Sequence, residues 1–366
     1  MSAPELTLDD VRAALDGTAP LAVLPEGPPA VVEAARRVLR PEEPLEPGAD
    51  VVVVTSGSTG SGRAVLLSAP ALEASAAATL ARLGGPGSWL LALPVSAIAG
   101  LQVLVRSVVS GGTPVPLRRG ESLSGAVRRL PDGRRYTALV PTQLRRDLDE
   151  EPDALRAFDA VLVGGAATDA ALRARAREAG VAVVTTFGMT ETAGGCVYDG
   201  RPLDGVRVRV TDGVELAGPT LALGYRLDPA ATDAAFADGW FRTRDAGHLD
   251  DGGFLYVHGR LDDVIVRGGE NLSPGEIENV LVEHPSVDAA AVVGIPDTEW
   301  GERVVAAVVP VDGAVIDEDE LREFVRAALR STKTPERIDV RVELPFNETG
   351  KLLRRVLRDE LAAQFG

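Results

Sequence analysis

A loop rich in glycine and hydroxyl side chains is the segment whose residue types most clearly suggest chemistry. It reads Val54-Thr-Ser-Gly-Ser-Thr-Gly-Ser-Gly-Arg-Ala-Val65 and follows a run of valines typical of a buried strand. Glycines let the backbone curl, so that amide and hydroxyl groups can face one anion, and the basic Arg63 stands close by. The segment predicts a phosphate site; for the segment alone, a Gly/Ser surface loop is the alternative.

A Walker A loop is one possible form of this segment. Gly57, Gly62 and Arg63 have the spacing G-x-x-x-x-G followed by a basic residue. However, a Walker A loop requires Lys where Arg63 stands, and a Ser or Thr for magnesium where Ala64 stands. These two positions disfavour a P-loop phosphotransferase. The dinucleotide pattern G-x-G-x-x-G does not fit either.

The charge balance limits the partners of this protein. Its 366 residues include 38 Lys+Arg and 54 Asp+Glu, which gives a formal net charge of −16. Such a chain is a poor general ligand for nucleic acid or an anionic membrane surface, so local groups must hold any anionic substrate. The single Cys196 cannot form an internal disulfide, and His248, His258 and His284 lack the spacing of metal ligands. Zinc-site and disulfide-scaffold classes are therefore excluded.

No signal peptide or membrane-length segment is visible in the sequence. The start Met1-Ser-Ala-Pro-Glu-Leu has no basic stretch followed by an apolar run. The longest apolar segments, such as 51–54 and 89–93, are much shorter than a bilayer span. We expect a cytoplasmic enzyme.

Short valine-rich runs alternate with segments of helical period through the first half of the chain. Continuous valine runs followed by helices predict strands that are buried on both faces of an α/β sheet. The fold class is therefore α/β. The expected strands are 51–54, 89–93, 160–163 and 181–184, and the expected helices are 69–83, 101–109 and 169–179.

The pattern changes in the second half. From about Gly205, short strands divided by Gly, Asp and Pro predict a small antiparallel, β-barrel-like subdomain. Further on, the sequence predicts a compact α+β unit, in which Ser273-Pro-Gly-Glu276 has the pattern of a helix capping box. We expect a large N-terminal domain, residues 1–262, and a small C-terminal domain, residues 263–366. The Pro-rich segment 41–48 should join elements within the first domain.

The phosphate-loop segment resembles that of the acyl-adenylate-forming superfamily, which contains acyl-CoA synthetases, peptide-synthetase adenylation domains and luciferases. That family usually has Pro-Lys-Gly where this chain has Gly62-Arg-Ala64, and Arg63 keeps the positive charge. The resemblance implies that Arg63 contacts the polyphosphate of ATP. It also implies that ATP is bound by the loop residues Thr55, Ser56, Gly57, Ser58, Thr59 and Gly60.

Two further segments resemble motifs of the superfamily, in the family's order. Val163-Gly-Gly-Ala166 is similar to the segment that lies along the adenine, which implies nucleotide binding by Gly164, Gly165 and Ala166. Thr186-Phe-Gly-Met-Thr-Glu191 is similar to Tyr-Gly-x-Thr-Glu, with an aromatic ring kept by Phe187.

The roles of the second motif follow from the same resemblance. Phe187 is expected to pack on the adenine, Thr190 to contact the α-phosphate and Glu191 to help to hold magnesium. Thr186 and Gly188 are assigned to the nucleotide, and Met189 to the acid.

The downstream motifs are also present. Gly218-Pro-Thr-Leu-Ala-Leu-Gly-Tyr225 matches a structural Gly-x-x-x-x-x-Gly-Tyr motif, and Thr243-Arg-Asp245 resembles Thr-Gly-Asp, whose Asp accepts the ribose hydroxyls. The segment 259–270 resembles the family's hinge motif, which implies that Asp262 is the hinge and that Arg260 binds nucleotide.

The last motif suggests a moving domain. Leu344-Pro-Phe-Asn-Glu-Thr-Gly-Lys351 resembles Leu-Pro-x-Asn-x-x-Gly-Lys, which carries the adenylation lysine. A catalytic Lys351 on a loop of a small separate domain favours a mechanism in which that domain moves. In the resembling family the domain rotates about the residue equivalent to Asp262. The rotation would bring Gly268 and Gly269 to the pantetheine passage.

The chemistry agrees with the resemblance. A carboxylate is a poor electrophile, and attack on the ATP α-phosphate converts it into an acyl group with AMP as leaving group. Positive charge must meet the charge that develops on the phosphates. We therefore expect ATP, Mg²⁺ and coenzyme A as cofactors. The expected catalytic residues are Lys351, Thr190, Glu191 and Arg63.

The segment from Leu93 to Ser107 bears on the acid. It resembles Leu-Pro-x-x-His-Ile-x-Gly-Leu-x-x-Leu-x-Arg-Ser of 2-succinylbenzoate:CoA ligases of menaquinone biosynthesis, with Ala97 at the His position. Ser96, Ala97 and Arg106 are therefore assigned to the acid. The Arg106 fork would suit a carboxylate, although a structural arginine is the alternative.

We expect an ATP-dependent acid:CoA ligase with 2-succinylbenzoate as its acid. The alternatives are an adenylating ligase for another aryl or alkyl acid, with CoA or a carrier protein as acceptor, and a non-catalytic nucleotide- or acyl-binding relative. Most superfamily members are longer, so a shortened N-terminal part is expected. A homodimer is possible because two-fold dimers are common.

Overall fold

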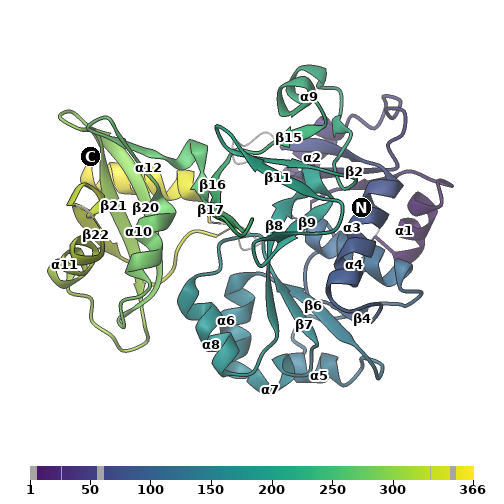
Figure 1. The fold of residues 1–366 in the computed structure, drawn as a ribbon, viewed down its shortest axis with the longest axis horizontal. Coiled ribbons are helices and arrows are strands. Elements are labelled where there is room, and N and C mark those ends of the chain that lie inside the picture. Colours follow the sequence, from purple (N-terminus) through teal and green to yellow (C-terminus); the bar gives the residue numbers. More distant parts are fainter. Residues whose placement is uncertain (1–5, 26, 56–61, 330, 347–351) are drawn as a thin grey trace.

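The fold has a large N-terminal part and a small C-terminal part, which lies to one side in light green and yellow (Figure 1). The computed structural model describes residues 6–25, 27–55, 62–329, 331–346 and 352–366. The α/β class with two domains of unequal size is confirmed. No helix within these ranges is both long and apolar enough to cross a membrane.

A seven-stranded sheet forms the centre of the large part. Its order is β10-β9-β8-β7-β6-β4-β5, in which β8, β7, β6, β4 and β5 are parallel and β9 and β10 run antiparallel at one edge. The strands are β4 (Ser88–Leu91), β5 (Val115–Pro116), β6 (Arg135–Leu139), β7 (Ala160–Val163), β8 (Val183–Met189), β9 (Gly194–Tyr198) and β10 (Arg201–Pro202).

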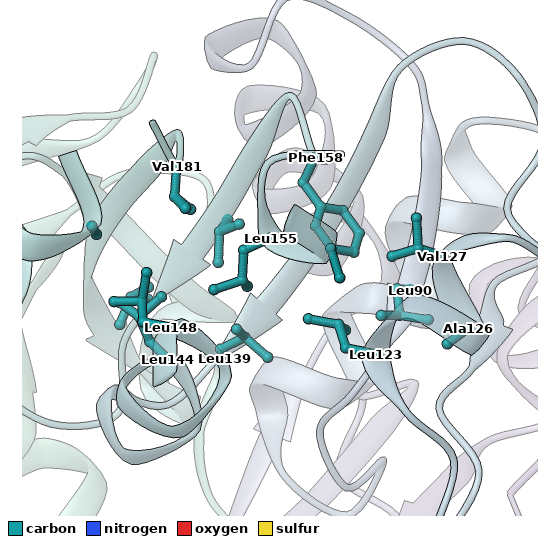
Figure 2. Close-up of a cluster of buried hydrophobic side chains, with 14 of the residues drawn as sticks. Leu90, Leu123, Ala126, Val127, Leu139, Leu144, Leu148, Leu155, Phe158 and Val181 are labelled. Atoms are coloured by element: carbon teal, nitrogen blue, oxygen red, sulfur yellow. The ribbon is translucent and has the colours of Figure 1, made fainter. Parts of the chain in front are cut away.

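Helices cover both faces of this sheet, as the valine-rich runs predicted. Leu139 and Val161 point to one helix layer, whose packing Figure 2 shows, and Tyr136 and Leu162 point to the other. Neighbouring residues of a strand therefore enter different cores. The first layer is α5 (Leu123–Val127), α6 (Pro141–Glu150), α7 (Pro152–Leu155) and α8 (Ala170–Glu178), and the second is α3 (Ala69–Arg82) and α4 (Ile98–Val109).

A four-stranded sheet carries the phosphate-loop segment. Its order is β1-β2-β3-β13, and β2 pairs with β3 in antiparallel register on either side of residues 56–61, which lie outside the described residues. β3 was not expected from the sequence, since its short Ala-Val-Leu-Leu run adjoins the helix α3. This region contains α1 (Leu8–Leu15), β1 (Leu21–Val23), α2 (Pro29–Leu39), β2 (Val51–Thr55), β3 (Arg63–Leu67) and β13 (Gly224–Tyr225).

The region after Gly205 is antiparallel, as predicted. It consists of a four-stranded sheet of order β11-β12-β15-β14 and a hairpin of β16 and β17. β16 packs against β11 and β12, so the two sheets enclose one small subdomain. The elements are β11 (Arg207–Val210), β12 (Val214–Ala217), α9 (Pro229–Ala235), β14 (Phe236–Ala237), β15 (Trp240–Arg242), β16 (Asp245–Leu249) and β17 (Leu255–Arg260).

The C-terminal part is a five-stranded sheet covered on both faces. Alternate residues of its long hairpin enter separate cores: Val292 and Ala306 face α10 and α11, while Val293 and Ala307 face α12. The elements are β18 (Ile265–Arg267), β19 (Glu270–Leu272), α10 (Pro274–Leu281), β20 (Val287–Asp297), β21 (Gly301–Pro310), α11 (Glu318–Ala328), β22 (Arg337–Val340) and α12 (Arg354–Phe365).

The capping box expected at Ser273 is wrong. The helix α10 begins where predicted, but no side chain caps it. The Ser273 hydroxyl donates instead to the backbone oxygen of His258 at 2.8 Å, and Glu276 accepts from Lys333 at 2.6 Å. Tertiary partners outcompete the local cap, because a neighbouring strand and a lysine lie within reach.

We propose that the domain boundary lies at Asp262, within the 3₁₀ turn Leu261–Asp263 that joins β17 to β18. An ion-pair cluster also crosses between the two parts. Arg145 of α6 contacts Asp169 at 3.0 Å and Asp288 of the C-terminal part at 3.0 Å. The C-terminal part is thus held by a covalent connection and by at least one polar contact.

The segment 41–48 is tied down within the large part, as predicted, by the side chain of Arg226. This side chain is 3 % exposed and contacts Glu46 at 2.7 Å. It also donates to the backbone oxygens of Pro44 at 3.2 Å, Arg40 at 2.9 Å and Glu43 at 2.7 Å, and to that of Leu39. One buried guanidinium therefore donates to four backbone oxygens in and beside this irregular turn.

We predict that Arg226→Ala lowers the free energy of unfolding by about 3 kcal/mol, because the half-buried Glu46 loses its partner and the carbonyls of the turn lose their buried donor. Urea denaturation followed by tryptophan fluorescence measures the change. Arg12→Ala is the control, since its ion pair with Asp9 is exposed and should change stability by less than about 0.5 kcal/mol. Equal losses in the two variants would contradict this role of Arg226.

Candidate active site

A cavity of about 1270 Å³ lies where the sheets of the large part meet. Its walls include the carboxyl ends of β2, β6, β7 and β8 and the start of α4. The carboxyl ends of parallel strands are the usual ligand crevice of an α/β sheet. The fold therefore brings the motifs from distant parts of the sequence into one cavity.

The phosphate side of the cavity begins at the β2–β3 hairpin. Thr55 and Arg63 both line the cavity, and the Thr55 hydroxyl donates to the backbone oxygen of Arg63 at 3.2 Å. The predicted ATP-binding residues Ser56, Gly57, Ser58, Thr59 and Gly60 lie outside the described residues. Thr55 and Arg63, which flank the loop on either side, thus both lie at the cavity.

Glu191 and Arg63 meet at Tyr225. Glu191 belongs to a 3₁₀ turn, Thr190–Thr192, that follows β8, and both Thr190 and Glu191 line the cavity. The Tyr225 hydroxyl donates to Glu191 Oε1 at 2.9 Å, and the Arg63 guanidinium lies 4.7 Å from the Tyr225 ring centroid. Burial and the neighbouring carboxylate raise the pKa of Tyr225 to about 12, so it is a hydrogen-bond donor at neutral pH.

Tyr225 is a site residue that the sequence motif did not reveal. It ends the Gly-x-x-x-x-x-Gly-Tyr segment, which was expected to have a structural role only. Its position depends on the pairing of β13 with β3, in which Tyr225 lies opposite Val65. A sequence gives no sign of such a long-range strand pair.

Glu191 fits a magnesium site of the kind that nucleotide enzymes use. Among the described residues, no group of three or more His, Cys, Asp or Glu side chains could hold a metal ion. Mg²⁺ commonly takes one or two carboxylates, with phosphate oxygens and water as its other ligands. A single carboxylate that lines the cavity and is oriented by Tyr225 meets this requirement.

The wall between β7 and β8 is built from small residues. A Cβ atom on Gly164 would lie 2.2 Å from Thr186 Oγ1, so only glycine allows this approach, and Gly165 has a positive φ of +82°. Gly164, Gly165, Thr186 and Gly188 line the cavity, as the nucleotide assignment requires. These four residues therefore form one wall of the cavity.

Ala166 and Phe187 are predicted nucleotide residues that do not line this cavity. Phe187 is half-buried and packs against the hydrophobic cluster that contains Trp89 and Leu162. The alternation of a strand explains this, since Phe187 lies between Thr186 and Gly188, which face the cavity. Stacking of Phe187 on adenine stays a prediction.

The side of the cavity at β16 and β17, which the sequence resemblance assigns to the ribose, carries a charged network. Asp245 and Arg260, which were assigned to the nucleotide, line the cavity, and so does Asp262, which was assigned to the hinge. Arg260 lies 3.8 Å from both Asp245 and Asp262, and the Asp245 amide donates to the Thr243 hydroxyl at 3.1 Å. Arg244, which the motif comparison did not assign, also lines the cavity and contacts Asp262 at 2.9 Å.

Gly268 and Gly269 lie away from this cavity, in the turn between β18 and β19. Their φ angles of +56° and +82° suit the two central positions of a tight hairpin turn, which favour glycine. The Gly268 amide donates to the backbone oxygen of Trp300 at 2.8 Å. Their role in a pantetheine passage stays a prediction.

The wall of the cavity that α4 forms contains a buried cation. Arg106 is 3 % exposed and lines the cavity from α4, as do Ser96 and Ala97 before that helix and Met189 at the end of β8. Arg106 Nη2 donates to the Tyr198 hydroxyl at 3.4 Å. Tyr198, which also lines the cavity, was not expected from any motif.

The Arg106 guanidinium has no carboxylate partner within 4.0 Å in the described part of the chain. It lies 5.0 Å from the centroid of the Trp89 ring, and its Nε has no hydrogen-bond partner. Burial lowers the pKa of Arg106, so a bound anion would stabilise the charged form. A buried cation with no carboxylate partner among the described residues is a candidate carboxylate subsite.

The C-terminal part also reaches the cavity. Phe346 lines the cavity and forms an isolated antiparallel bridge with Leu352. The predicted adenylation residue Lys351 lies between them and outside the described residues. Phe346, five residues before Lys351, is therefore at the cavity in this structure.

Known proteins share these features. The "AMP-binding enzyme" family matches residues 8–221, and the "AMP-binding enzyme C-terminal domain" family matches residues 276–351. A Mycobacterium tuberculosis (strain CDC 1551 / Oshkosh) protein named "Probable 2-succinylbenzoate--CoA ligase" is 43% identical over 375 residues, which cover 99% of this chain and 97% of that protein.

Solved structures agree with this match. ATP-bound MatB from Rhodopseudomonas palustris has a TM-score of 0.79 and 26% identity, covering 87% of this chain and 69% of its own. The o-succinylbenzoate CoA synthetase MenE from Bacillus subtilis, in complex with its acyl-adenylate intermediate OSB-AMP, has a TM-score of 0.78 and 27% identity, covering 97% and 81%.

We predict that Tyr225→Phe raises the Mg²⁺ concentration needed for half-maximal ATP binding by about tenfold or more. The hydroxyl orients Glu191, and the loss of such a partner of a metal ligand commonly costs that much. Calorimetric titration of ATP at several Mg²⁺ concentrations measures the effect. Tyr256→Phe removes an exposed hydroxyl and serves as the control. An unchanged Mg²⁺ requirement would separate Tyr225 from the metal site.

Proposed function

We propose that this chain, which belongs to the AMP-binding enzyme family, is an ATP-dependent ligase that joins 2-succinylbenzoate to coenzyme A. In the first step a carboxylate of the acid attacks the ATP α-phosphate, which gives the acyl-adenylate and pyrophosphate. In the second step the CoA thiol attacks the acyl carbon, which gives the thioester and AMP. The relative from Mycobacterium tuberculosis and the structure of MenE with OSB-AMP support this reaction.

The burial of the Arg106 guanidinium in the cavity wall is the observation that most favours a dicarboxylic acid as the substrate. An acid with a single carboxylate would place that group at the ATP α-phosphate and leave Arg106 buried without an anion. 2-Succinylbenzoate has two carboxylates, so one can react while the other pairs with Arg106. The planar guanidinium suits a carboxylate through two parallel hydrogen bonds, and the buried surroundings strengthen this pairing.

The remaining residues are proposed to bind and orient the nucleotide. Arg63 and the loop that it follows would hold the polyphosphate, and Thr190 would contact the α-phosphate. Asp245 would accept the ribose hydroxyls, with Arg260 beside it at 3.8 Å. Glu191 would hold Mg²⁺, which neutralises phosphate charge when it is bound. These groups supply local positive charge and hydrogen bonds in a chain whose net charge is −16.

We predict that Arg106→Met raises the KM for 2-succinylbenzoate about thirtyfold or more while the KM for ATP changes less than about threefold, because only the acid loses a buried ion pair. Pyrophosphate release measures both constants. Arg201→Met is the matched control, since its guanidinium lies 4.0 Å from the Phe254 ring centroid and outside the cavity.

An analogue that lacks the ring carboxylate makes this test specific. 4-Oxo-4-phenylbutanoate should bind poorly to the unaltered protein, and Arg106→Met should weaken its binding no further. If the variant affects the analogue and 2-succinylbenzoate equally, Arg106 has a structural role only. If neither acid supports pyrophosphate release in the unaltered protein, the acid is a different one.

We predict that Lys351→Ala slows acyl-adenylate formation by about a hundredfold or more, because the charge that meets the α-phosphate is lost. Thioester formation from synthetic acyl-adenylate and CoA should remain within a few fold. Lys333→Met is the control, since the chain has only these two lysines and Lys333 pairs with Glu276 at 2.6 Å. Equal loss of both half-reactions would remove the separate role of Lys351.

A further inference from the structure

Arg244 joins the ribose side of the cavity to the connection between the domains. It stands between Thr243 and Asp245, in the position where the motif that this segment resembles has glycine. Its side chain lines the cavity, and its Nη2 lies 2.9 Å from Asp262 Oδ1. Its backbone oxygen accepts from the Leu261 amide at 2.7 Å. Arg244 therefore contacts two successive residues of the connection.

The connection has a second, weaker cationic neighbour. Arg260 lies 3.8 Å from Asp262, against 2.9 Å for Arg244. Arg260 also lies 3.8 Å from Asp245, so its charge is shared between two carboxylates. Among these contacts, the Arg244–Asp262 pair is the one at hydrogen-bond distance. The position of Asp262 against the ribose side thus depends mainly on Arg244.

The direction of the connection decides where the C-terminal part lies. β18 begins three residues after Asp262, and Phe346 of the same part lines the cavity. The other polar contact described above, between Arg145 and Asp288, lies on α6, outside the cavity. A small change at Asp262 would therefore shift the whole C-terminal part relative to the cavity.

We propose that Arg244 is a positioning residue, which clamps Asp262 and so holds the C-terminal part in the orientation that brings Phe346, five residues before Lys351, to the cavity. This inference rests on the proposed function, because it assigns the clamp to the adenylation step. The contact is not required by the motif, where glycine has no side chain to make it. The Arg244–Asp262 contact would slow the movement of the C-terminal part in this chain.

The two half-reactions test the clamp. Arg244→Gly should slow acyl-adenylate formation roughly two- to fivefold, the range expected for a partly exposed ion pair, with an unchanged KM for ATP. Thioester formation from synthetic acyl-adenylate and CoA should be unchanged or faster. Arg244→Lys keeps a single charge near Asp262 and should recover most of the rate. A raised KM for ATP with an unchanged rate would instead make Arg244 a nucleotide contact and overturn the proposal.

A distance measurement tests the orientation directly. Spin labels on Val109→Cys and Val315→Cys report on the two parts, because both positions are exposed, at 40% and 89%. The native Cys196 is buried, and its pKa is raised to about 12, so it should resist labelling. We expect Arg244→Gly to broaden the distance distribution and Arg244→Lys to leave it narrow. Arg145→Ala breaks the contact with Asp288, which lies outside the cavity. This variant is the control for the effect of losing a polar contact between the two parts on the distance distribution.

The outcomes separate the clamp from the proposed reaction. If the unaltered protein forms no acyl-adenylate from any acid, the proposed function fails, while the distance measurement still shows whether the clamp exists. If the unaltered protein is active and Arg244→Gly leaves the distance distribution unchanged, the clamp does not exist. If Arg244→Gly broadens the distribution and slows both half-reactions equally, Arg244 does not favour adenylation.

Discussion

The structure depends on placing a few positive charges beside one cavity in a protein whose net charge is −16. The long-range field of such a chain repels anions, so ATP and the acid must be held by groups within hydrogen-bond distance. Arg63 and Arg106 serve two separate walls of the cavity. Arg106 shows the cost of this arrangement, because it is buried and no carboxylate of the described residues lies within 4.0 Å of it. Such an arginine is stable mainly if an anion joins it.

The strands bring these groups to one cavity because their carboxyl ends lie on the same side of the large part. β6, β7 and β8 are parallel and have helices on both faces, so the loops at their carboxyl ends converge on one side. The β2–β3 hairpin adds the phosphate side, and the pairing of β13 with β3 carries Tyr225 to Glu191. Strand pairing thus sets distances between residues that are far apart in the sequence. The C-terminal part adds Phe346 to the cavity, and Arg244 and Arg260 contact Asp262 in the connection to that part.

Most of the fold and the site could be predicted because their signals are local. Strands β2, β4, β7 and β8 and helices α3, α4 and α8 were visible as apolar periods, whereas the central strand β6 was not among the expected strands. The motif residues Thr55, Glu191 and Asp245 all line the cavity. The unexpected features are tertiary. β3 is a short apolar run beside a helix, and Ser273 donates to a neighbouring strand instead of capping α10. Neither of these outcomes is encoded in the residues next to it.

The sequence by itself determined several of the strands and helices, the family motifs and the types of groups that a phosphate and a carboxylate require. Only the tertiary structure decided which of those residues meet. It placed the half-buried Phe187 against a hydrophobic cluster and Thr186 at the cavity, because neighbouring residues of a strand face opposite sides. It also gave Arg106 its burial and gave Arg244 its contact with Asp262. Burial and long-range ion pairs depend on how distant segments pack, and the spacing of residues along a chain does not specify that packing.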